Sequence, residues 1–140
     1  MLVSEIMTAD VLTVRETGTL VQALTTMSEN GIRHLPVVDD AGTLVGIVSD
    51  TDLQQFHLSR VSDLETLDRL KTRLNQPIAS DMSADVLSVG PEADITEAID
   101  LMIEERIGAL PVVDAEADRL VGIVSYIDVL RAARDLFGKE

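Results

Sequence analysis

The chain has 140 residues, of which 46% are hydrophobic, and its 25 acidic and 11 basic residues give a formal net charge of -14. This length is typical of one domain, and the apolar fraction is sufficient for a packed core. So acidic a chain is repelled by nucleic acid and by anionic membranes, which we exclude as partners. The lack of cysteine excludes disulfides, zinc–thiolate sites and cysteine nucleophiles. Without a signal peptide or a membrane-length apolar stretch, the sequence predicts a soluble, cytoplasmic protein.

The chain contains an internal repeat. Residues 7–53 align with residues 82–129, first 75 positions apart and then 76 positions apart after one inserted residue near Arg119. Identical residues cluster in three pairs of blocks: 7–14 with 82–89, 35–39 with 110–114, and 44–49 with 120–125. Two copies are too few for a solenoid, so we expect two similar units about a pseudo-twofold axis. The predicted organisation is a first repeat over 1–60, a linker helix over 61–76 and a second repeat over 77–140, together forming one compact module.

The elements of the two repeats follow the same order. Short β-branched runs at 11–14 and 86–89 predict strands. Capping-box pairs at Thr19 with Gln22 and at Asp94 with Glu97 then predict helices with an apolar stripe. The apolar runs 35–39 and 44–48, and their counterparts in the second repeat, predict strands joined by a hairpin-like loop. A last helix is predicted from Ser49 and from Ser125. The fold class is therefore α/β (α+β), with β-α-β-β-α twice.

The linker helix has two interpretations. Ser62 and Glu65 form a further capping box, and four leucines follow at helical spacing: Leu64, Leu67, Leu70 and Leu74. The helix either packs on its own module through these leucines or presents them as a dimer face.

The strongest candidate for a binding site recurs in both repeats. A buried strand runs into a predicted helix start at Ser49 with Asp52, and again at Ser125 with Asp128. The free amides and the positive end of the helix dipole favour the binding of a phosphate there, and the serine hydroxyl adds a hydrogen-bond donor. The aspartate can accept hydrogen bonds from the hydroxyls of a ribose. The same Ser-x-x-Asp spacing is also a capping box that needs no ligand.

Three further features bear on this site. Gly46 and Gly122 lie late in their strands, which indicates a close approach to the backbone or a bulge. Arg33 and His34 precede a strand and offer positive charge, whereas the second repeat has Gly108 and Ala109 there. Two arginines beyond Asp128, Arg131 and Arg134, are possible substitutes or solvated charges near a helix end.

Catalytic patterns are absent from the sequence. No Rossmann or P-loop glycine motif and no nucleophile elbow occurs. The acidic loops at Asp39, Asp40 and Asp114 lack the spacing of an EF-hand, which favours solvated turns over a cation site. We therefore expect no catalytic residues, no required cofactor and no metal site.

These residues carry a family resemblance. Each repeat resembles a cystathionine-β-synthase (CBS) domain, and the two together resemble a tandem CBS pair, or Bateman module, here free-standing. The motifs are residues 6–8, 31–39 and 46–52, with second copies at 81–83, 107–114 and 122–128. The resemblance implies a compact α/β unit with two clefts between the repeats that bind adenosine-containing ligands: AMP, ADP, ATP or S-adenosylmethionine, with or without Mg²⁺.

The resemblance also implies roles for particular residues. Asp52 and Asp128 would hold ribose hydroxyls, Ser49 and Ser125 would meet phosphate, and Arg33 and His34 would add basic phosphate contacts. Backbone around the adenine would come from two sets: Thr13, Val14, Ile32 and Pro36 in the first repeat, and Ser88, Val89, Ile107, Ala109 and Pro111 in the second. Gly108 and Ala109 depart from a symmetrical pattern, so the first cleft is expected to suit a charged nucleotide. The second is expected to take a less phosphorylated ligand or stay empty.

The resulting hypothesis is a non-enzymatic regulatory module that senses adenine nucleotides, forms a homodimer and relays ligand occupancy to a partner protein. The alternative is a structural dimerisation or interaction module with vestigial clefts. No residue pattern in the sequence supports a third hypothesis, an enzyme.

Overall fold

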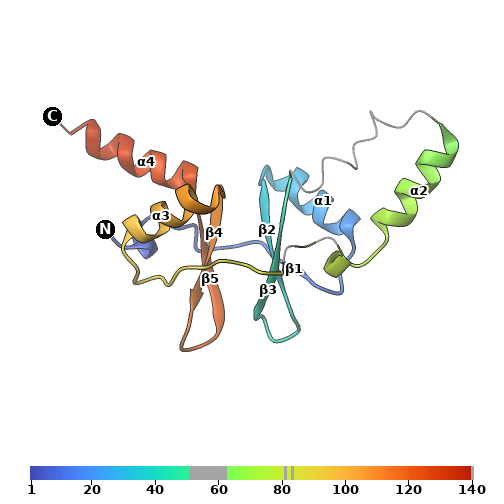
Figure 1. The fold of residues 1–140 in the computed structure, drawn as a ribbon, viewed down its shortest axis with the longest axis horizontal. Coiled ribbons are helices and arrows are strands. Elements are labelled where there is room, and N and C mark those ends of the chain that lie inside the picture. The colour runs from blue at the N-terminus through green and yellow to red at the C-terminus, as the bar shows by residue number, and fades with distance from the viewer. Residues whose placement is uncertain (51–62, 81, 83, 140) are drawn as a thin grey trace. The chain divides into compact units, whose positions relative to one another are not determined.

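The computed structural model describes residues 1–50, 63–80, 82 and 84–139. Its elements in chain order are η1 (Val3–Glu5), β1 (Val14–Arg15), α1 (Leu20–Asn30), β2 (His34–Val38), β3 (Leu44–Ser49), α2 (Leu64–Leu74), η4 (Ile78–Ser80), α3 (Ile95–Glu105), β4 (Ala109–Asp114), β5 (Arg119–Ser125) and α4 (Tyr126–Phe137) (Figure 1). Contacts divide the chain into two compact units. We call Leu12–Val86 the β1–β3 unit, and Met1–Val11 with Leu87–Glu140 the β4–β5 unit.

The β1–β3 unit contains a three-stranded sheet in the order β1-β2-β3. β1 runs parallel to β2, with Val14 opposite Val37, and β2 runs antiparallel to β3, with His34 opposite Ser49. The predicted strand over 11–14 is wrong in extent, because only Val14 and Arg15 pair with β2. The two longer strands were predicted to within one residue at each end.

The β4–β5 unit repeats this arrangement. β4 and β5 form an antiparallel hairpin in which Ala109 lies opposite Ser125, and α3 and α4 lie at the end of the hairpin away from its loop (Figure 1). In place of the predicted strand over 86–89, Val89 alone makes a parallel bridge to Val112. The predicted mixed α/β fold is confirmed.

Each unit has its own aliphatic core, as the shortage of aromatic residues requires. The fully buried side chains include Leu20, Leu35 and Val48 in one core and Leu110, Val112 and Val124 in the other. At roughly 1.5–3 kcal/mol for each buried aliphatic side chain, these cores are the main source of stability.

The segment that opens each repeat packs in the unit formed by the other repeat. Val3 is fully buried in the core of the β4–β5 unit, and its amide donates to Ala93 O at 2.9 Å. Ile78, 75 residues later, is fully buried in the β1–β3 unit, and its amide donates to Gly18 O at 2.8 Å. The units defined by contact therefore differ from the repeats defined by sequence.

Both explanations considered for Gly46 and Gly122 are realised. The hairpin register shifts between Val37 and Val38 opposite Gly46, and between Val112 and Val113 opposite Gly122, so each strand carries a bulge. A methionine also packs over each glycine: Met82 over Gly46 and Met7 over Gly122. A side chain at either position would collide with that methionine.

The structure forms some of the predicted helix caps and differs from the prediction at others. Thr19 with Gln22 and Ser125 with Asp128 form the predicted capping boxes. Asp94 caps α3, but its carboxylate accepts from Thr96 N (3.0 Å) and Thr96 Oγ1 (2.8 Å) rather than from Glu97 as predicted. The cap of α2 is Asp63, one residue after the predicted Ser62, which lies outside the described residues.

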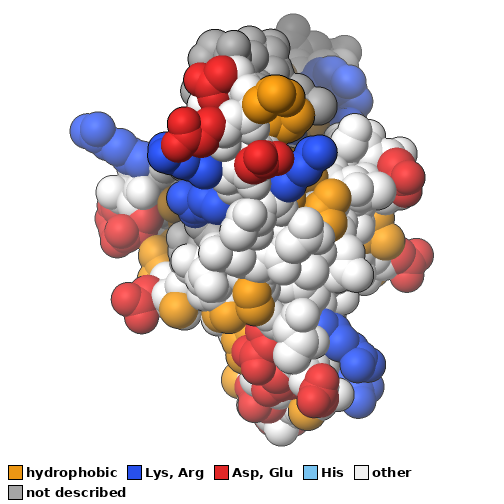
Figure 2. Space-filling view, turned by 90° about the vertical axis from the view of Figure 1, so that its right-hand side faces the viewer, with side chains coloured by type: hydrophobic (Ala, Val, Ile, Leu, Met, Phe, Trp, Pro, Cys, Tyr) orange, Lys and Arg blue, Asp and Glu red, His pale blue; other side chains and the backbone are white. Residues whose placement is uncertain are grey.

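The leucines of α2 face mainly their own unit. Leu70 is buried in the core of the β1–β3 unit and Leu74 packs against that core, whereas Leu64 is 79% exposed. This confirms the interpretation of α2 as a helix that packs on its own module. Figure 2 shows the face on the side of α2, where charged side chains of both signs mix and apolar side chains occur in small groups. In the described part of the chain, no helix is both long and apolar enough to cross a membrane.

Candidate ligand-binding site

In the β1–β3 unit, the strand register brings several of the predicted site residues to one edge of the sheet. Ser49 ends β3 directly opposite His34, which begins β2. The amide of Asp50 donates to Arg33 O at 2.9 Å, so the chain leaving β3 lies beside the chain entering β2. Val14 pairs with Val37 in a parallel ladder, so Thr13, which precedes Val14, lies beside β2 on the side away from β3.

The β4–β5 unit builds the same edge. Ser125 ends β5 opposite Ala109, and the amide of Tyr126 donates to Gly108 O at 2.9 Å. Val89 joins β4 through two backbone bonds, from its amide to Pro111 O (3.1 Å) and from the Val113 amide to its carbonyl (2.9 Å), which places Ser88 nearby. The segment around Val89 therefore lies beside β4, and the segment around Gly108 lies beside the start of α4.

Asp128 is held in a capping box at this edge. Its Oδ2 accepts from Ser125 N (2.9 Å) and Ser125 Oγ (3.1 Å), and its own amide donates to Ser125 Oγ. The remaining oxygen, Oδ1, lies 3.9 Å from the Arg131 guanidinium, and the side chain is 12% exposed. Since a carboxylate has about four acceptor positions, Asp128 can cap the helix and still accept hydrogen bonds from a ligand.

The two edges differ in charge. Exposed Arg33, half-buried His34 and exposed Asp50 line the edge of the β1–β3 unit. At the matching positions the β4–β5 unit has Gly108, Ala109 and Tyr126. The second edge therefore lacks charged side chains at these three positions.

Burial separates the remaining predicted residues into two groups. Ile32 and Ile107 are half-buried against the cores, and Thr13 and Ser88 are exposed. Pro36 and Pro111 are fully buried, and Val89 and Ala109 are 4% and 5% exposed. The buried residues shape the edge and offer few groups to a ligand. The predicted Asp52 lies outside the described residues.

One residue of note was missed at the sequence level. Arg106 ends α3 in the left-handed conformation (φ 55°, ψ 47°), which its counterpart Gly31 also adopts (φ 61°, ψ 32°). The alignment of an arginine with a glycine was the available signal, because that conformation favours glycine.

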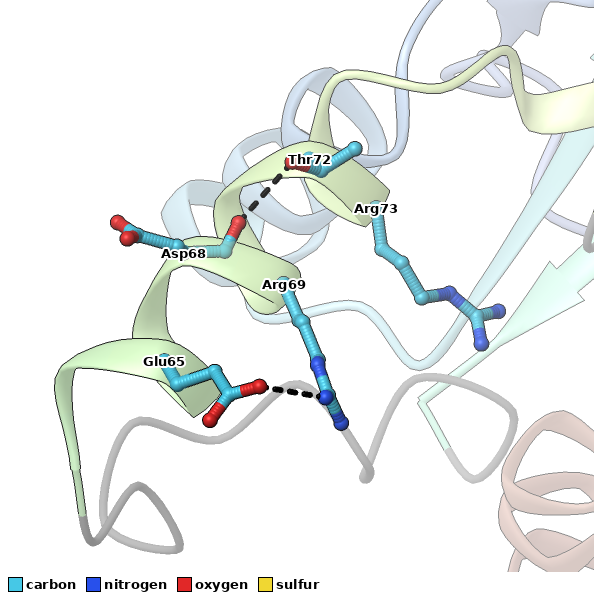
Figure 3. A pocket seen from close by; sticks show the side chains of 5 residues that line it. All are labelled: Glu65, Asp68, Arg69, Thr72 and Arg73. Carbon is cyan, nitrogen blue, oxygen red and sulfur yellow. Dashed lines mark hydrogen bonds and ion pairs between the residues drawn. The ribbon is translucent and has the colours of Figure 1, made fainter.

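Two surface hollows lie elsewhere. One, of about 450 Å³, is formed along α2 by Glu65, Asp68, Arg69, Thr72 and Arg73 (Figure 3). In it Arg69 extends on the same side as Arg73 and pairs with Glu65 at 2.7 Å. The other, of about 510 Å³, is lined by Val14, Arg15, Thr17, Gly18, Gln22 and Thr26. Apart from Val14, neither contains a predicted site residue. No cluster of three potential metal ligands occurs among the described residues.

The family model for CBS domains matches residues 3–58 and 78–135. The chain belongs to the CBS domain family. Both matched segments coincide with the sequence repeats, so the predicted tandem CBS pair is confirmed.

Two solved CBS pairs share this fold along almost their whole length. CBSX2 from Arabidopsis thaliana, in a structure with AMP, is 31% identical, with a TM-score of 0.79 over 96% of this chain and 97% of that one. The CBS domain pair of protein MJ0100, in complex with 5′-methylthioadenosine and S-adenosyl-L-methionine, is 26% identical, with a TM-score of 0.78 over 100% and 98%. Adenosine-containing ligands thus occur in two CBS pairs of the same fold.

Several relatives carry the CBS pair as part of a longer chain. Homoserine O-acetyltransferase of Methanococcoides burtonii is 36% identical over 92% of this chain, which spans 23% of the relative's length. A CBS domain-containing protein of Dictyostelium discoideum is 33% identical over 92% of this chain and 88% of its own length. The chain therefore corresponds to less than a quarter of the acetyltransferase and to most of the second protein.

Proposed function

We propose that this CBS pair is a non-enzymatic regulatory module that binds AMP, ADP, ATP or S-adenosylmethionine at the strand edges described above and relays occupancy to a partner protein. The observation that supports this most is that, in each unit, a strand-ending serine lies opposite the first residue of the neighbouring strand, beside the chain that enters it. The adenosine ligands of CBSX2 and MJ0100 agree with it.

At the edge of the β4–β5 unit, Asp128 is suited to a ribose. Its Oδ2 is engaged by Ser125, so the oxygen available to a ligand is Oδ1, which would accept from ribose hydroxyls. Two amides at the start of α4 are already bonded, that of Tyr126 to Gly108 O and that of Asp128 to Ser125 Oγ. The helix start therefore has little donor capacity left for a phosphate, which favours a ribose contact there.

Regulation would operate by linkage. A ligand that binds one conformation of the pair more tightly shifts the population toward it, by no more than its differential affinity, typically ~1–3 kcal/mol. A partner that recognises the same conformation would then bind more tightly as well.

The test is a calorimetric titration of the wild type with adenosine, AMP, ADP, ATP, S-adenosylmethionine and GTP, with and without Mg²⁺. We expect Asp128→Ala to weaken adenosine-ligand affinity by roughly 10–100-fold, because hydrogen bonds to a charged group contribute ~1.5–3 kcal/mol. Asp94→Ala, which removes a cap from α3 instead, is the matched control and should bind as the wild type does. Unchanged affinity of Asp128→Ala would reject the site, and a wild type that binds no adenosine ligand would reject the function.

A second candidate function, an interaction module that dimerises, is favoured by a different observation. None of the residues of α4 is buried, and its apolar Leu130 and Phe137 are 58% and 80% exposed. Exposed apolar surface of this kind is typical of a protein contact.

A further inference from the structure

Met7 and Met82 are equivalent residues of the two repeats, and each lies over a glycine. The Sδ and Cγ atoms of Met7 pack against Gly122 in β5, and those of Met82 pack against Gly46 in β3. Each methionine also packs against the core of its unit. Because glycine has no side chain, the thioether rests directly on the strand backbone. The same contact therefore fastens an opening segment to a strand in both units.

Exposure to solvent separates the methionines of the chain. Met27 and Met102, on α1 and α3, are only 5% and 9% exposed, whereas Met1 is 50% exposed. Met7 and Met82 lie between these extremes, since both pack against a core and both are half-buried. These two methionines therefore combine a packing role with access for a small solute.

Methionine is the main target that this chain offers to a peroxide. The sequence contains five methionines and neither cysteine nor tryptophan. The thioether of methionine is apolar and adapts to irregular gaps, whereas its sulfoxide is polar and disrupts the contacts that the thioether made. The effect of oxidation therefore depends on how closely each sulfur is packed.

A sulfoxide does not fit the place that each thioether occupies. Even a Cβ on either glycine would collide with the sulfur, so an oxygen added on that side of the sulfur has no room. At Gly122 the carbonyl of Thr8 is close as well, and it is an acceptor that cannot donate to the sulfoxide oxygen. The oxidised side chain either holds an unsatisfied oxygen in the contact, which is costly, or turns into solvent and gives the contact up.

The segments that carry these methionines are the ones that open the repeats. The amide of Met7 donates to Val3 O at 2.9 Å, and Val3 is fully buried. The amide of Met82 donates to Ile78 O at 3.0 Å, and Ile78 is fully buried in the same way. Each methionine is thus tied through one hydrogen bond to the residue that anchors its segment. Loss of the contact with glycine would destabilise the unit on which that segment packs.

We propose that Met7 and Met82 are a pair of oxidation sites through which hydrogen peroxide loosens the two opening segments. Sδ attacks one oxygen of the peroxide and the O–O bond breaks. The second oxygen leaves as hydroxide and takes the proton of the first, which gives the sulfoxide and water. The sulfur is oxidised by two electrons and the peroxide is reduced by two. Methionine sulfoxide reductases reverse this change, and the inference does not depend on the proposed function.

Peptide mapping by mass spectrometry tests where oxygen is added. The folded chain is treated with hydrogen peroxide, the reaction is stopped with catalase, and a sample unfolded in urea is treated in parallel. We expect the folded protein to form sulfoxide at Met7 and Met82 while Met27 and Met102 react only in the unfolded sample. Protection of all four in the folded protein, or an equal reaction of all four, would overturn the inference.

Thermal melts test the consequence of oxidation. We expect the melting temperature of the oxidised wild type to fall by a few degrees and to recover on treatment with methionine sulfoxide reductase. The double variant Met7→Leu, Met82→Leu keeps apolar side chains of similar volume and should melt at the same temperature before and after peroxide. Met1→Leu is the matched control and should lose as much as the wild type does.

An oxidised wild type with an unchanged melting temperature would overturn the inference, and so would a double variant that peroxide destabilises as much as the wild type. Recovery by the reductase is measured on the wild type alone, so it tests the inference even if the double variant does not fold. A melting temperature that falls with peroxide and is not restored, although the sulfoxides are reduced, would also contradict it.

Discussion

Gly46 and Gly122 each lie under a methionine side chain, but the two sites differ in what surrounds the glycine. The three atoms that a Cβ at Gly46 would approach most closely all belong to Met82, with Cγ at 2.9 Å and Sδ closer still. A Cβ at Gly122 would meet Met7 Sδ at 2.6 Å and also Thr8 O at 2.9 Å. Thr8 is bonded to Ile123 in both directions, at 2.8 and 3.0 Å, so its carbonyl is held in place.

The two glycines should therefore respond differently to alanine. We expect Gly46→Ala and Gly122→Ala each to lower the free energy of unfolding by ~1–3 kcal/mol through overpacking. Adding Met82→Ala to Gly46→Ala should recover much of the lost free energy of unfolding. Adding Met7→Ala to Gly122→Ala should recover little of it, because the Thr8 carbonyl remains. Double-mutant cycles measured by urea unfolding give the two coupling energies. A purely additive cycle at Gly46 would contradict the proposed contact.

The caps of the helices show how a short sequence motif fixes the start of an element. Asp94, Thr19 and Ser125 were identified as caps from spacing alone, and each accepts a backbone hydrogen bond in the structure. Hydrogen bonds from the amide and hydroxyl of Thr96 hold the pKa of Asp94 below its ordinary value of 3.8. The carboxylate form is therefore favoured by folding.

A depressed pKa in the folded state has a definite pH dependence. The stabilisation from Asp94 is present above its ordinary pKa of 3.8 and is lost as the pH falls below that value toward the lower folded pKa. Asp94→Asn keeps a capping side chain without the charge. Thermal melts of both proteins from pH 7 to pH 3 should show the advantage of the wild type shrink below pH ~4. An advantage independent of pH would mean that the charge of Asp94 is not involved.

The elements themselves were predictable where local chemistry decides them. Apolar stripes and caps located α1, α3 and α4, and apolar runs located β2 to β5. The strand expected at 11–14 shortened to Val14–Arg15 because pairing with β2, and not the composition of the run, sets its extent. The candidate site residues could be proposed from the sequence, but which of them lie close together depends on the register of β2 with β3 and of β4 with β5, which no local signal contains.

The sequence also could not predict in which unit the opening segment of each repeat packs. Val3 and Ile78 occupy equivalent places in the repeats, and each is buried in the unit of the other repeat. The repeat shows that the two segments are equivalent without showing where either one packs. Each unit therefore depends on a piece of chain that sequence boundaries assign elsewhere, so the two repeats are expected to fold together.

In the described part of the chain, α4 carries more exposed large apolar residues than any other element. Tyr126, Leu130 and Phe137 recur at helical spacing on one face of the helix and are 43%, 58% and 80% exposed. On α2, by contrast, Leu70 and Leu74 pack on their own unit and Leu64 alone among the four leucines is classed as exposed. If the protein forms the dimer considered as its second function, the structure favours α4 over α2 as the contact.

A comparison of charge substitutions on the two helices tests this choice. We expect the wild type to sediment as a dimer at micromolar concentration and the double variant Leu130→Glu, Phe137→Glu to sediment as a monomer, because charges on the apolar face of α4 would have to be desolvated. Leu64→Glu, at a leucine of α2 that is 79% exposed, is the control and should remain dimeric. Circular dichroism of the double variant checks that α4 is still folded, since neither side chain is buried in its own unit. A dimer that Leu64→Glu breaks and the α4 variant keeps would move the interface to α2, and a monomeric wild type would remove the dimerisation function altogether.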